Sequence, residues 1–232
     1  MSKKISILLS TYNEALVIEE TLKLIFETIE NVEVILVDDN SKDGTLEKVK
    51  KFKNKNIKIF SRNQRGLASA FLLGLINSTG DVVGWLDSNM GQLIKKFPEM
   101  INNLDKYDIV LLSRYINEGS DNRSRLRVLS SKIINFFCRF ILSRQIFDYT
   151  SGIFVMNRSS LRNVVPVAYG HGEFFIEFLY KAIKSELTIK EIPYVQPADL
   201  EGISKTASSM FRFFRIGLNY FLRVIVIRLR DF

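Results

Sequence analysis

The segment Asp81-Val82-Val83-Gly84-Trp85-Leu86-Asp87-Ser88-Asn89-Met90 joins an apolar run to a group of oxygen-bearing side chains. The run predicts a strand, and in open α/β sheets ligands bind at the carboxyl ends of the strands. Carboxylate and amide oxygens are suitable ligands for Mg²⁺. Because side chains two apart on an extended strand point to the same side, Asp87 and Asn89 are expected to share one metal ion.

Strand and helix patterns alternate on both sides of this segment. Apolar runs predict strands over residues 5–9, 32–37, 57–61, 82–86 and 108–113, and helical patterns lie between them, with helices predicted up to residue 29 and over 45–52, 66–78 and 97–104. The second half adds predicted helices over 125–142, 173–185 and 207–232, and short apolar runs over 153–156 and 187–192. This alternation predicts an α/β fold with a mainly parallel, Rossmann-like sheet, helices on both faces, and a C-terminal amphipathic helix.

Three predicted strands end in polar clusters, at residues 10–14, 38–41 and 87–89. One such cluster is most simply a polar loop, but three at the same edge of a parallel sheet indicate a ligand site. Asp38 and Asp39 can accept hydrogen bonds from a base and a ribose, whereas Ser41 or Asp43 is suited to cap the following helix. No Gly-x-Gly-x-x-Gly follows the first strand and no Walker motif is present, so dinucleotide and P-loop sites lack their defining feature.

The chain has 232 residues, a formal net charge of +8 and 47% hydrophobic residues. An excess of positive charge favours an anionic partner, such as a phosphorylated substrate, an anionic membrane surface or nucleic acid. Nucleic acid is disfavoured because the basic residues lie among apolar ones and no recognition module is visible. The single cysteine, Cys138, excludes a disulfide framework. No signal-peptide pattern precedes the first strand, and no charge-free window of about 20 residues predicts a membrane span.

The C-terminal segment 211–230 combines Arg with Phe, Leu, Ile and Val. This composition favours a helix lying in a membrane interface, and the alternative is a helix packed on the domain's own core. The aromatic stripe Phe136, Phe137 and Phe140 has the same two interpretations. The expected division is therefore an α/β domain over 1–206 and a basic amphipathic helix over 207–232.

Seven short motifs in order resemble those of family-2 glycosyltransferases with the GT-A fold, and within them the dolichyl- or polyprenyl-phosphate mannosyltransferases. They are Ser10-Thr11-Tyr12-Asn13-Glu14, Val37-Asp38-Asp39-Asn40-Ser41-x-Asp43-Gly44-Thr45, Arg65-Gly66-Leu67-Ala68, Asp87-Ser88-Asn89, Ser113-Arg114-Tyr115, Asp148-Tyr149-Thr150-Ser151-Gly152 and Gly202-x-Ser204-Lys205. The resemblance implies an inverting enzyme that moves a sugar from a GDP- or UDP-linked donor to a polyprenyl phosphate. It also implies Mg²⁺ or Mn²⁺, a peripheral position on the cytoplasmic face of a membrane, and in some cases a separate membrane-protein partner.

The resemblance assigns roles residue by residue. The nucleotide sugar is expected to meet Thr11, Tyr12, Glu14, Asp38, Asp39, Arg65 and Gly66. The expected catalytic residues are Asp87, on the metal–diphosphate, Arg114, on phosphate, and Asp148. Asn89 takes the position of the second metal ligand. The acceptor phosphate is expected to meet Arg127, Ser131 and Lys205. The lone histidine, His171, is expected to be a loop residue near the acceptor.

Three positions depart from the family pattern. Asn89 replaces a metal-binding Asp, Gly91 replaces a Gln common in relatives, and Asp199 replaces a common Arg. These changes predict weaker metal affinity than in Asp-x-Asp enzymes. Two alternatives remain. One is a saccharide acceptor, which would make Asp148 a true base and Arg127 dispensable. The other is a catalytically weak regulatory subunit that binds nucleotide sugar or lipid phosphate.

Overall fold

The computed structural model describes residues 3–168, 170, 172–198 and 210–230. Its main sheet has seven strands in the order β3-β2-β1-β4-β7-β5-β8, and a second sheet pairs β6 with β9. The strand bounds are β1 Ile5–Thr11, β2 Val32–Asp38, β3 Ile57–Ser61, β4 Val82–Trp85, β5 Ile109–Ser113, β6 Ser120–Asp121, β7 Phe154–Asn157, β8 Ile189–Pro193 and β9 Val195–Gln196. Neighbours in the main sheet run parallel except at β7, which is antiparallel to both β4 and β5.

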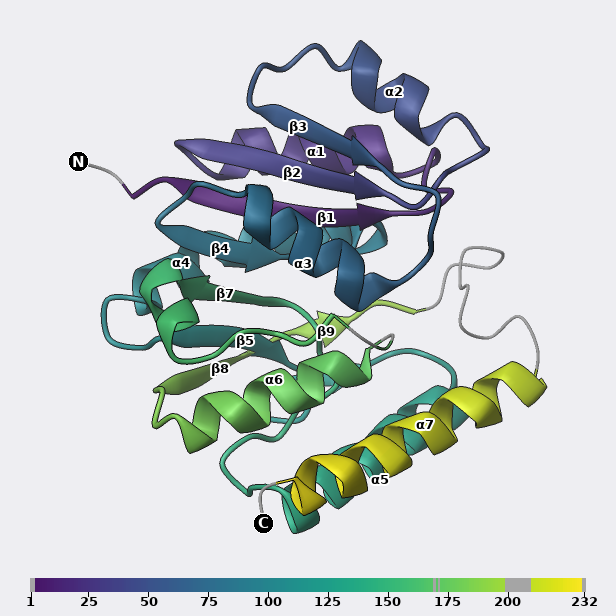
Figure 1. The fold of residues 1–232 in the computed structure, drawn as a ribbon, viewed down its shortest axis with the longest axis vertical. Coiled ribbons are helices and arrows are strands. Elements are labelled where there is room, and N and C mark those ends of the chain that lie inside the picture. Colours follow the sequence, from purple (N-terminus) through teal and green to yellow (C-terminus); the bar gives the residue numbers. More distant parts are fainter. Residues whose placement is uncertain (1–2, 169, 171, 199–209, 231–232) are drawn as a thin grey trace.

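Helices cover both faces of the sheet (Figure 1). Helices α1 (Ile18–Thr28), α2 (Thr45–Lys51) and α4 (Phe97–Asn103) share one hydrophobic cluster with strand residues such as Ile7 and Leu36. Helices α3 (Leu67–Asn77), α5 (Arg125–Ile141), α6 (Glu173–Lys184) and α7 (Met210–Leu229) share the other cluster, with residues such as Leu8 and Phe154. Alternate residues of each strand therefore face opposite layers, as the pleat requires. The prediction of a mainly parallel α/β sheet with helices on both faces is confirmed.

The elements that were predicted agree in their bounds with the structure to within a few residues, but the short strands β6 and β9 and two 3₁₀ helices were not predicted. A 3₁₀ helix, η1 (Ser88–Lys96), follows β4 directly, and a second, η2 (Arg158–Arg162), follows β7. Asp87 and Asn89 therefore do not lie on an extended strand, and the reason given for their shared direction is wrong. The predicted capping by Asp43 is confirmed, because Asp43 Oδ1 accepts a hydrogen bond at 3.1 Å from the backbone N–H of Thr45, the first residue of α2. Gly44, with φ of 93°, occupies the position between them.

Helices α5 and α7 lie side by side at one end of the molecule (Figure 1). Phe137 of α5 packs edge-on against Phe221 of α7 with ring centroids 5.0 Å apart, and Val224 of α7 is fully buried. Arg223 of α7 pairs with the buried Glu177 of α6. The C-terminal helix thus packs on the domain's own core. This was the alternative to the favoured interpretation of a helix lying in a membrane interface.

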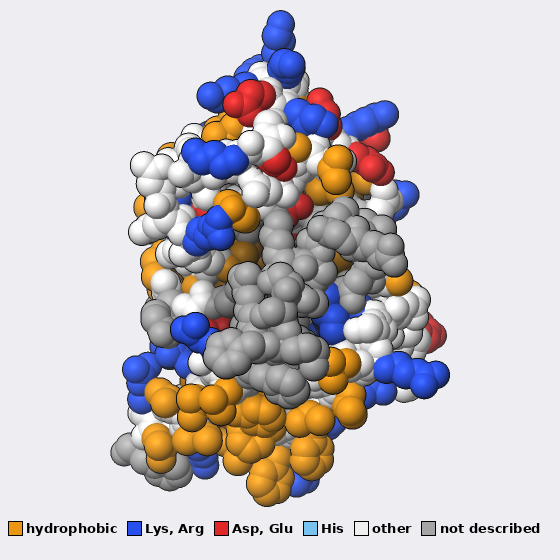
Figure 2. Space-filling view, turned by 90° about the vertical axis from the view of Figure 1, so that its right-hand side faces the viewer, with side chains coloured by type: hydrophobic (Ala, Val, Ile, Leu, Met, Phe, Trp, Pro, Cys, Tyr) orange, Lys and Arg blue, Asp and Glu red, His pale blue; other side chains and the backbone are white. Residues whose placement is uncertain are grey.

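The outer side of the same helix pair is apolar and exposed, and we call it the α5–α7 face. Its members are Leu126, Leu129, Ile133, Phe136, Phe140, Leu218, Leu222, Ile225, Val226 and Leu229. Phe136 and Phe140 are 73% and 69% exposed, so two of the three aromatic residues in the stripe point away from the core. Figure 2 shows this apolar area at the lower end of the molecule with Lys and Arg side chains beside it. Within the described residues, no helix is long and apolar enough to cross a membrane.

Candidate active site

The polar strand ends meet at one edge of the main sheet. Thr11 stands beside Asp38, which stands beside Ser61, in parallel register. Thr11 borders a cavity of about 1440 Å³ that extends from this edge to α5 and α7. Eleven of the fourteen residues expected to form the site line it: Thr11, Tyr12, Glu14, Asp39, Arg65, Gly66, Asp87, Asn89, Arg114, Arg127 and Ser131. Of the other three, Asp38 and Asp148 do not line the cavity, and Lys205 lies outside the described residues, as do His171 and Asp199.

Asp38 holds the loop between β2 and α2 in place. Its carboxylate accepts hydrogen bonds from Thr11 Oγ1 at 3.0 Å and from the Ser41 backbone N–H at 2.9 Å, and the residue is fully buried. Asn13 N–H in turn donates to Ser41 Oγ at 2.9 Å. These contacts join the first two polar clusters. We therefore assign Asp38 a positioning role in place of the predicted contact with the nucleotide.

Asp39 faces the cavity, and both of its carboxylate oxygens have partners. Arg62 Nε donates to Oδ1 at 2.6 Å, and the Gly66 N–H donates to Oδ2 at 2.9 Å. Arg62 was not predicted from the sequence to belong to the site. A signal was present, because Arg62 directly follows β3 in the same way as the polar clusters follow the other strands. Nearby, the Arg65 guanidinium lies 3.8 Å from the centre of the Tyr12 ring. Tyr12, Asp39 and Arg65 thus form one side of the cavity, at the ends of β1, β2 and β3.

Asp87 and Asn89 line the cavity where β4 passes into η1. The departure at Gly91 has a steric reason, because a Cβ there would lie 2.4 Å from Thr21 Oγ1. The side chain that relatives carry at this position is therefore excluded by α1. Among the described residues no three His, Cys, Asp or Glu side chains cluster as a metal site. One carboxylate and one amide still fit Mg²⁺ or Mn²⁺, since such ions are often held by one or two carboxylates plus substrate phosphates.

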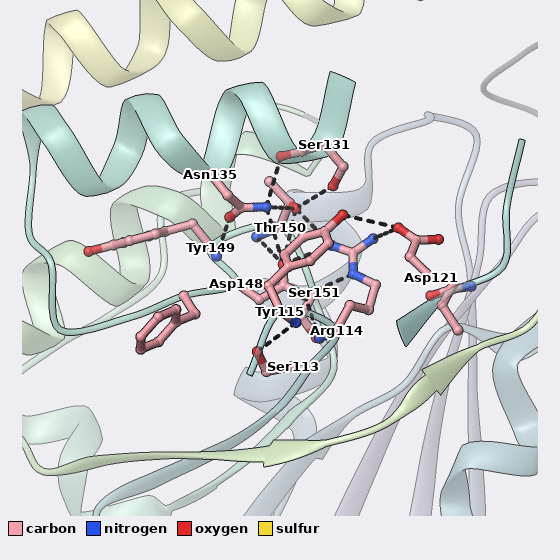
Figure 3. Close-up of polar contacts among 12 residues, drawn as sticks. Ser113, Arg114, Tyr115, Asp121, Ser131, Asn135, Asp148, Tyr149, Thr150 and Ser151 are labelled. Atoms are coloured by element: carbon pink, nitrogen blue, oxygen red, sulfur yellow. Dashed lines mark hydrogen bonds and ion pairs between the residues drawn. The ribbon is translucent and has the colours of Figure 1, made fainter. Parts of the chain in front are cut away.

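Arg114 and Asp148 form a buried ion pair below the cavity (Figure 3). Arg114 Nε and Nη2 donate to the two carboxylate oxygens at 2.8 and 2.7 Å, and the Arg114 backbone N–H donates at 3.0 Å. Thr150 and Asn135 donate to the same carboxylate. Burial alone would raise the pKa of Asp148, but the charge and hydrogen bonds of Arg114 outweigh it and lower that pKa. A fully buried carboxylate with these partners is suited to orient Arg114 rather than to accept a proton.

Arg127 and Ser131 stand on the first turns of α5, above this pair. Ser131 Oγ and Thr150 Oγ1 are 3.1 Å apart, which connects α5 to the Asp148 loop (Figure 3). The opposite wall includes Gly217, Tyr220 and Phe221 of α7. The contribution of α7 to the cavity was not predicted, because its sequence pattern indicates an amphipathic helix but not the surface on which it packs.

Comparison with known proteins identifies the family. The family model described as glycosyl transferase family 2 matches residues 6–165. The chain belongs to glycosyl transferase family 2. The matched region of this family-2 chain contains the strands from β1 to β7, and it ends before α6 and α7.

Two curated relatives carry the same name, dolichol-phosphate mannosyltransferase. The family-2 chain is 29% identical to the one from Pyrococcus furiosus over 223 residues, covering 91% of this chain and 62% of the relative. It is 27% identical to the one from Saccharomyces cerevisiae over 226 residues, covering 90% of this chain and 84% of the relative. The chain thus spans less than two thirds of the length of the archaeal relative.

Solved structures of glucosyl-3-phosphoglycerate synthase from Mycobacterium tuberculosis share the fold. One complex, with Mn²⁺, UDP and glucosyl-3-phosphoglycerate, superposes with a TM-score of 0.74 at 19% identity, covering 97% of this chain and 80% of that one. Another, with Mn²⁺, UDP-glucose and phosphoglyceric acid, gives a TM-score of 0.75 at 19% identity, with 98% and 80% covered. The predicted GT-A fold of the family-2 chain is confirmed.

Proposed function

We propose that this family-2 glycosyltransferase moves a sugar from a GDP- or UDP-linked donor to a polyprenyl phosphate at a membrane surface. The observation that carries the proposal is the course of the cavity. It begins at the strand ends with Tyr12 and Asp39, passes Asp87 and the arginines, and ends against apolar side chains of α5 and α7. A nucleotide sugar requires the polar strand ends, an acceptor phosphate requires the arginines, and the start of a hydrocarbon chain requires apolar side chains. The cavity offers these three surroundings in this order.

The chemistry needs little help from a base. A phosphate monoester is ionised near neutral pH, so its oxygen can attack the anomeric carbon while the bond from that carbon to the nucleotide diphosphate breaks. The burial of Asp148 agrees with this, because the alternative of a saccharide acceptor requires Asp148 itself to accept the proton of the hydroxyl. Asp87 and Asn89 would hold the divalent cation, which supplies positive charge to the departing diphosphate. Arg127 suits the acceptor phosphate, since a guanidinium fork matches phosphate oxygens.

The decisive experiment incubates the purified protein with membranes and a panel of radiolabelled nucleotide sugars, followed by organic extraction. Label in the organic phase with one donor would identify donor and acceptor class together. Label in a water-soluble saccharide would support the alternative acceptor. No transfer with any donor, when lipid phosphate and membrane proteins are supplied, would favour the regulatory-subunit alternative. That alternative rests on Asn89 and on Asp199, which lies outside the described residues.

The proposal places the α5–α7 face in the membrane interface. Phe136→Ser combined with Phe140→Ser is expected to lower partitioning onto vesicles of phosphatidylcholine and phosphatidylglycerol at least about tenfold, since a buried Phe contributes about 1.5–3 kcal/mol. Vesicle co-sedimentation measures this. Thermal stability should not fall, because both rings are exposed. The matched control is Leu16→Ser with Ile76→Ser, two exposed apolar residues elsewhere. Equal binding by the two double variants would contradict the assignment.

The neutral ligand at position 89 makes a separate prediction. Asn89→Asp restores a second negative charge beside Asp87 and is expected to lower the Mn²⁺ concentration for half-maximal turnover several-fold, because carboxylates bind hard cations more strongly than amides do. A metal titration of initial rate measures this, with Asn102→Asp on the exposed side of α4 as the charge-matched control. Half-activation by micromolar metal in the wild type, unchanged in Asn89→Asp, would refute the prediction.

A further inference from the structure

A buried carboxylate, Asp121, lies between two arginines at the edge of the cavity. Its side chain is 1% exposed. Arg123 Nε and Nη2 donate to its two oxygens at 2.8 and 2.6 Å, and Arg114 Nη1 lies 3.6 Å from Oδ2. Tyr115 Oη donates to the same carboxylate at 3.0 Å (Figure 3 shows Asp121, Tyr115 and Arg114). Burial would raise the pKa of Asp121, but Arg123 and Arg114 outweigh it and lower the pKa to about 2.

The position of Asp121 is set by the backbone. Strand β6 carries it and pairs with β9, with Asp121 opposite Gln196, and Gln196 also lines the cavity. Four residues after Asp121 the chain enters α5, which carries Arg127 and Ser131. Arg123 therefore stands between a short sheet and a long helix, and its guanidinium is oriented by a carboxylate that solvent does not reach.

One edge of the Arg123 guanidinium is used by Asp121, and the other is available. Within the described part of the chain, Nη1 of Arg123 makes no hydrogen bond, while the side chain is 17% exposed and lines the cavity together with Arg114, Arg127 and Ser131. A guanidinium has five N–H donors in a planar fork, so an Arg held along one edge can still donate to a phosphate from the other.

We propose that Arg123 is a further binding residue for the phosphate monoester of the acceptor, oriented by Asp121. The inference rests on the proposed function, which assigns this part of the cavity to the acceptor. Arg114, Arg123 and Arg127 bring three positive charges, and Asp121 and Asp148 bring two negative ones. The cluster thus has a surplus of one positive charge to attract a phosphate. Arg123 is not among the residues that the family resemblance assigned to the site.

The same phosphate chemistry has two sources, a lipid headgroup or a small soluble acceptor, and the test separates them. Trp85, the single tryptophan of the chain, lines the cavity. Its fluorescence reports binding by the 232-residue chain without turnover. The probes are citronellyl phosphate, a short soluble analogue of a polyprenyl phosphate, and 3-phosphoglycerate, with citronellol as the uncharged reference.

Arg123→Ala is expected to weaken binding of citronellyl phosphate about tenfold to a hundredfold, the usual effect of losing a hydrogen bond to a charged group. Arg123→Lys keeps a charge beside Asp121 and loses the fork. It is expected to weaken binding at least several-fold, and it decides the outcome if Arg123→Ala fails to fold. Arg125→Ala, an exposed arginine two residues away, is the control and should bind like the wild type.

The outcomes separate this inference from the proposed function. Weaker binding of citronellyl phosphate in the folded variants supports a lipid phosphate. The same loss confined to 3-phosphoglycerate supports Arg123 as a phosphate-binding residue but points to a soluble acceptor. Wild-type affinity in both Arg123 variants, or an equal loss in Arg125→Ala, overturns the inference while leaving the proposed function standing. A wild type that binds neither phosphate overturns both.

Discussion

Replacing Asp87 with Asn is expected to lower kcat/KM for sugar transfer by about 10²–10³-fold, the range found when one preorganised group that stabilises transition-state charge is removed. Asp87 lies between β4 and η1 and lines the cavity, and Asn89 beside it is neutral. Asp87→Asn would thus leave two amides and no formal negative charge at this pair. Weaker metal binding would leave the departing diphosphate less well neutralised.

Initial rates at saturating Mn²⁺, together with equilibrium binding of the nucleotide sugar with and without metal, test this expectation. Asp81→Asn is the matched control. Asp81 stands at the other end of the same strand, where it accepts a hydrogen bond from the Lys4 N–H at 2.9 Å. The control should retain wild-type kinetics. If Asp87→Asn kept more than about a tenth of wild-type kcat/KM under these conditions, Asp87 would not hold the metal–diphosphate, and the donor site would have to be reassigned.

Asp148→Ala is expected to lower the free energy of unfolding by about 3–5 kcal/mol, because it leaves the charge of Arg114 buried without its main partner. The Arg114 side chain is 3% exposed and that of Asp148 is fully buried. Urea denaturation measures the loss. The double variant Arg114→Met/Asp148→Leu removes both charges and should be more stable than Asp148→Ala alone. A double variant that is less stable than Asp148→Ala would show that the pair is not coupled in this way.

The pH dependence of stability provides an independent check. The pKa of Asp148 is lowered in the folded chain from its ordinary value of 3.8, so the folded state binds fewer protons than the unfolded state in this range. The stabilisation by Asp148 is complete above its unfolded pKa and is lost as the pH falls through the folded value. The free energy of unfolding of Asp148→Ala should therefore fall less steeply with decreasing pH below pH 3.8 than that of the wild type.

Much of the fold and part of the site follow from local patterns. The apolar runs that became β1 to β5 are short, are bounded by polar or turn residues, and alternate with helical patterns, so their type and order were predictable. The direction of β7 was not, because an antiparallel strand between β4 and β5 has the same apolar composition as a parallel one. The 3₁₀ helix after β4 escaped prediction because no local signal separates Ser88–Lys96 from an ordinary loop.

The sequence by itself determined the α/β class, the three polar strand ends, and the residue types that a phosphate-rich substrate requires. Only the tertiary structure decided which of those residues face the cavity. Asp38 and Asp39 are adjacent in the sequence, yet one is buried in a loop network and the other lines the cavity. Asp148 is paired with Arg114, and Arg123 with Asp121. The physical reason is that burial and pairing depend on neighbours distant in the chain, whereas strand and helix patterns depend on near ones.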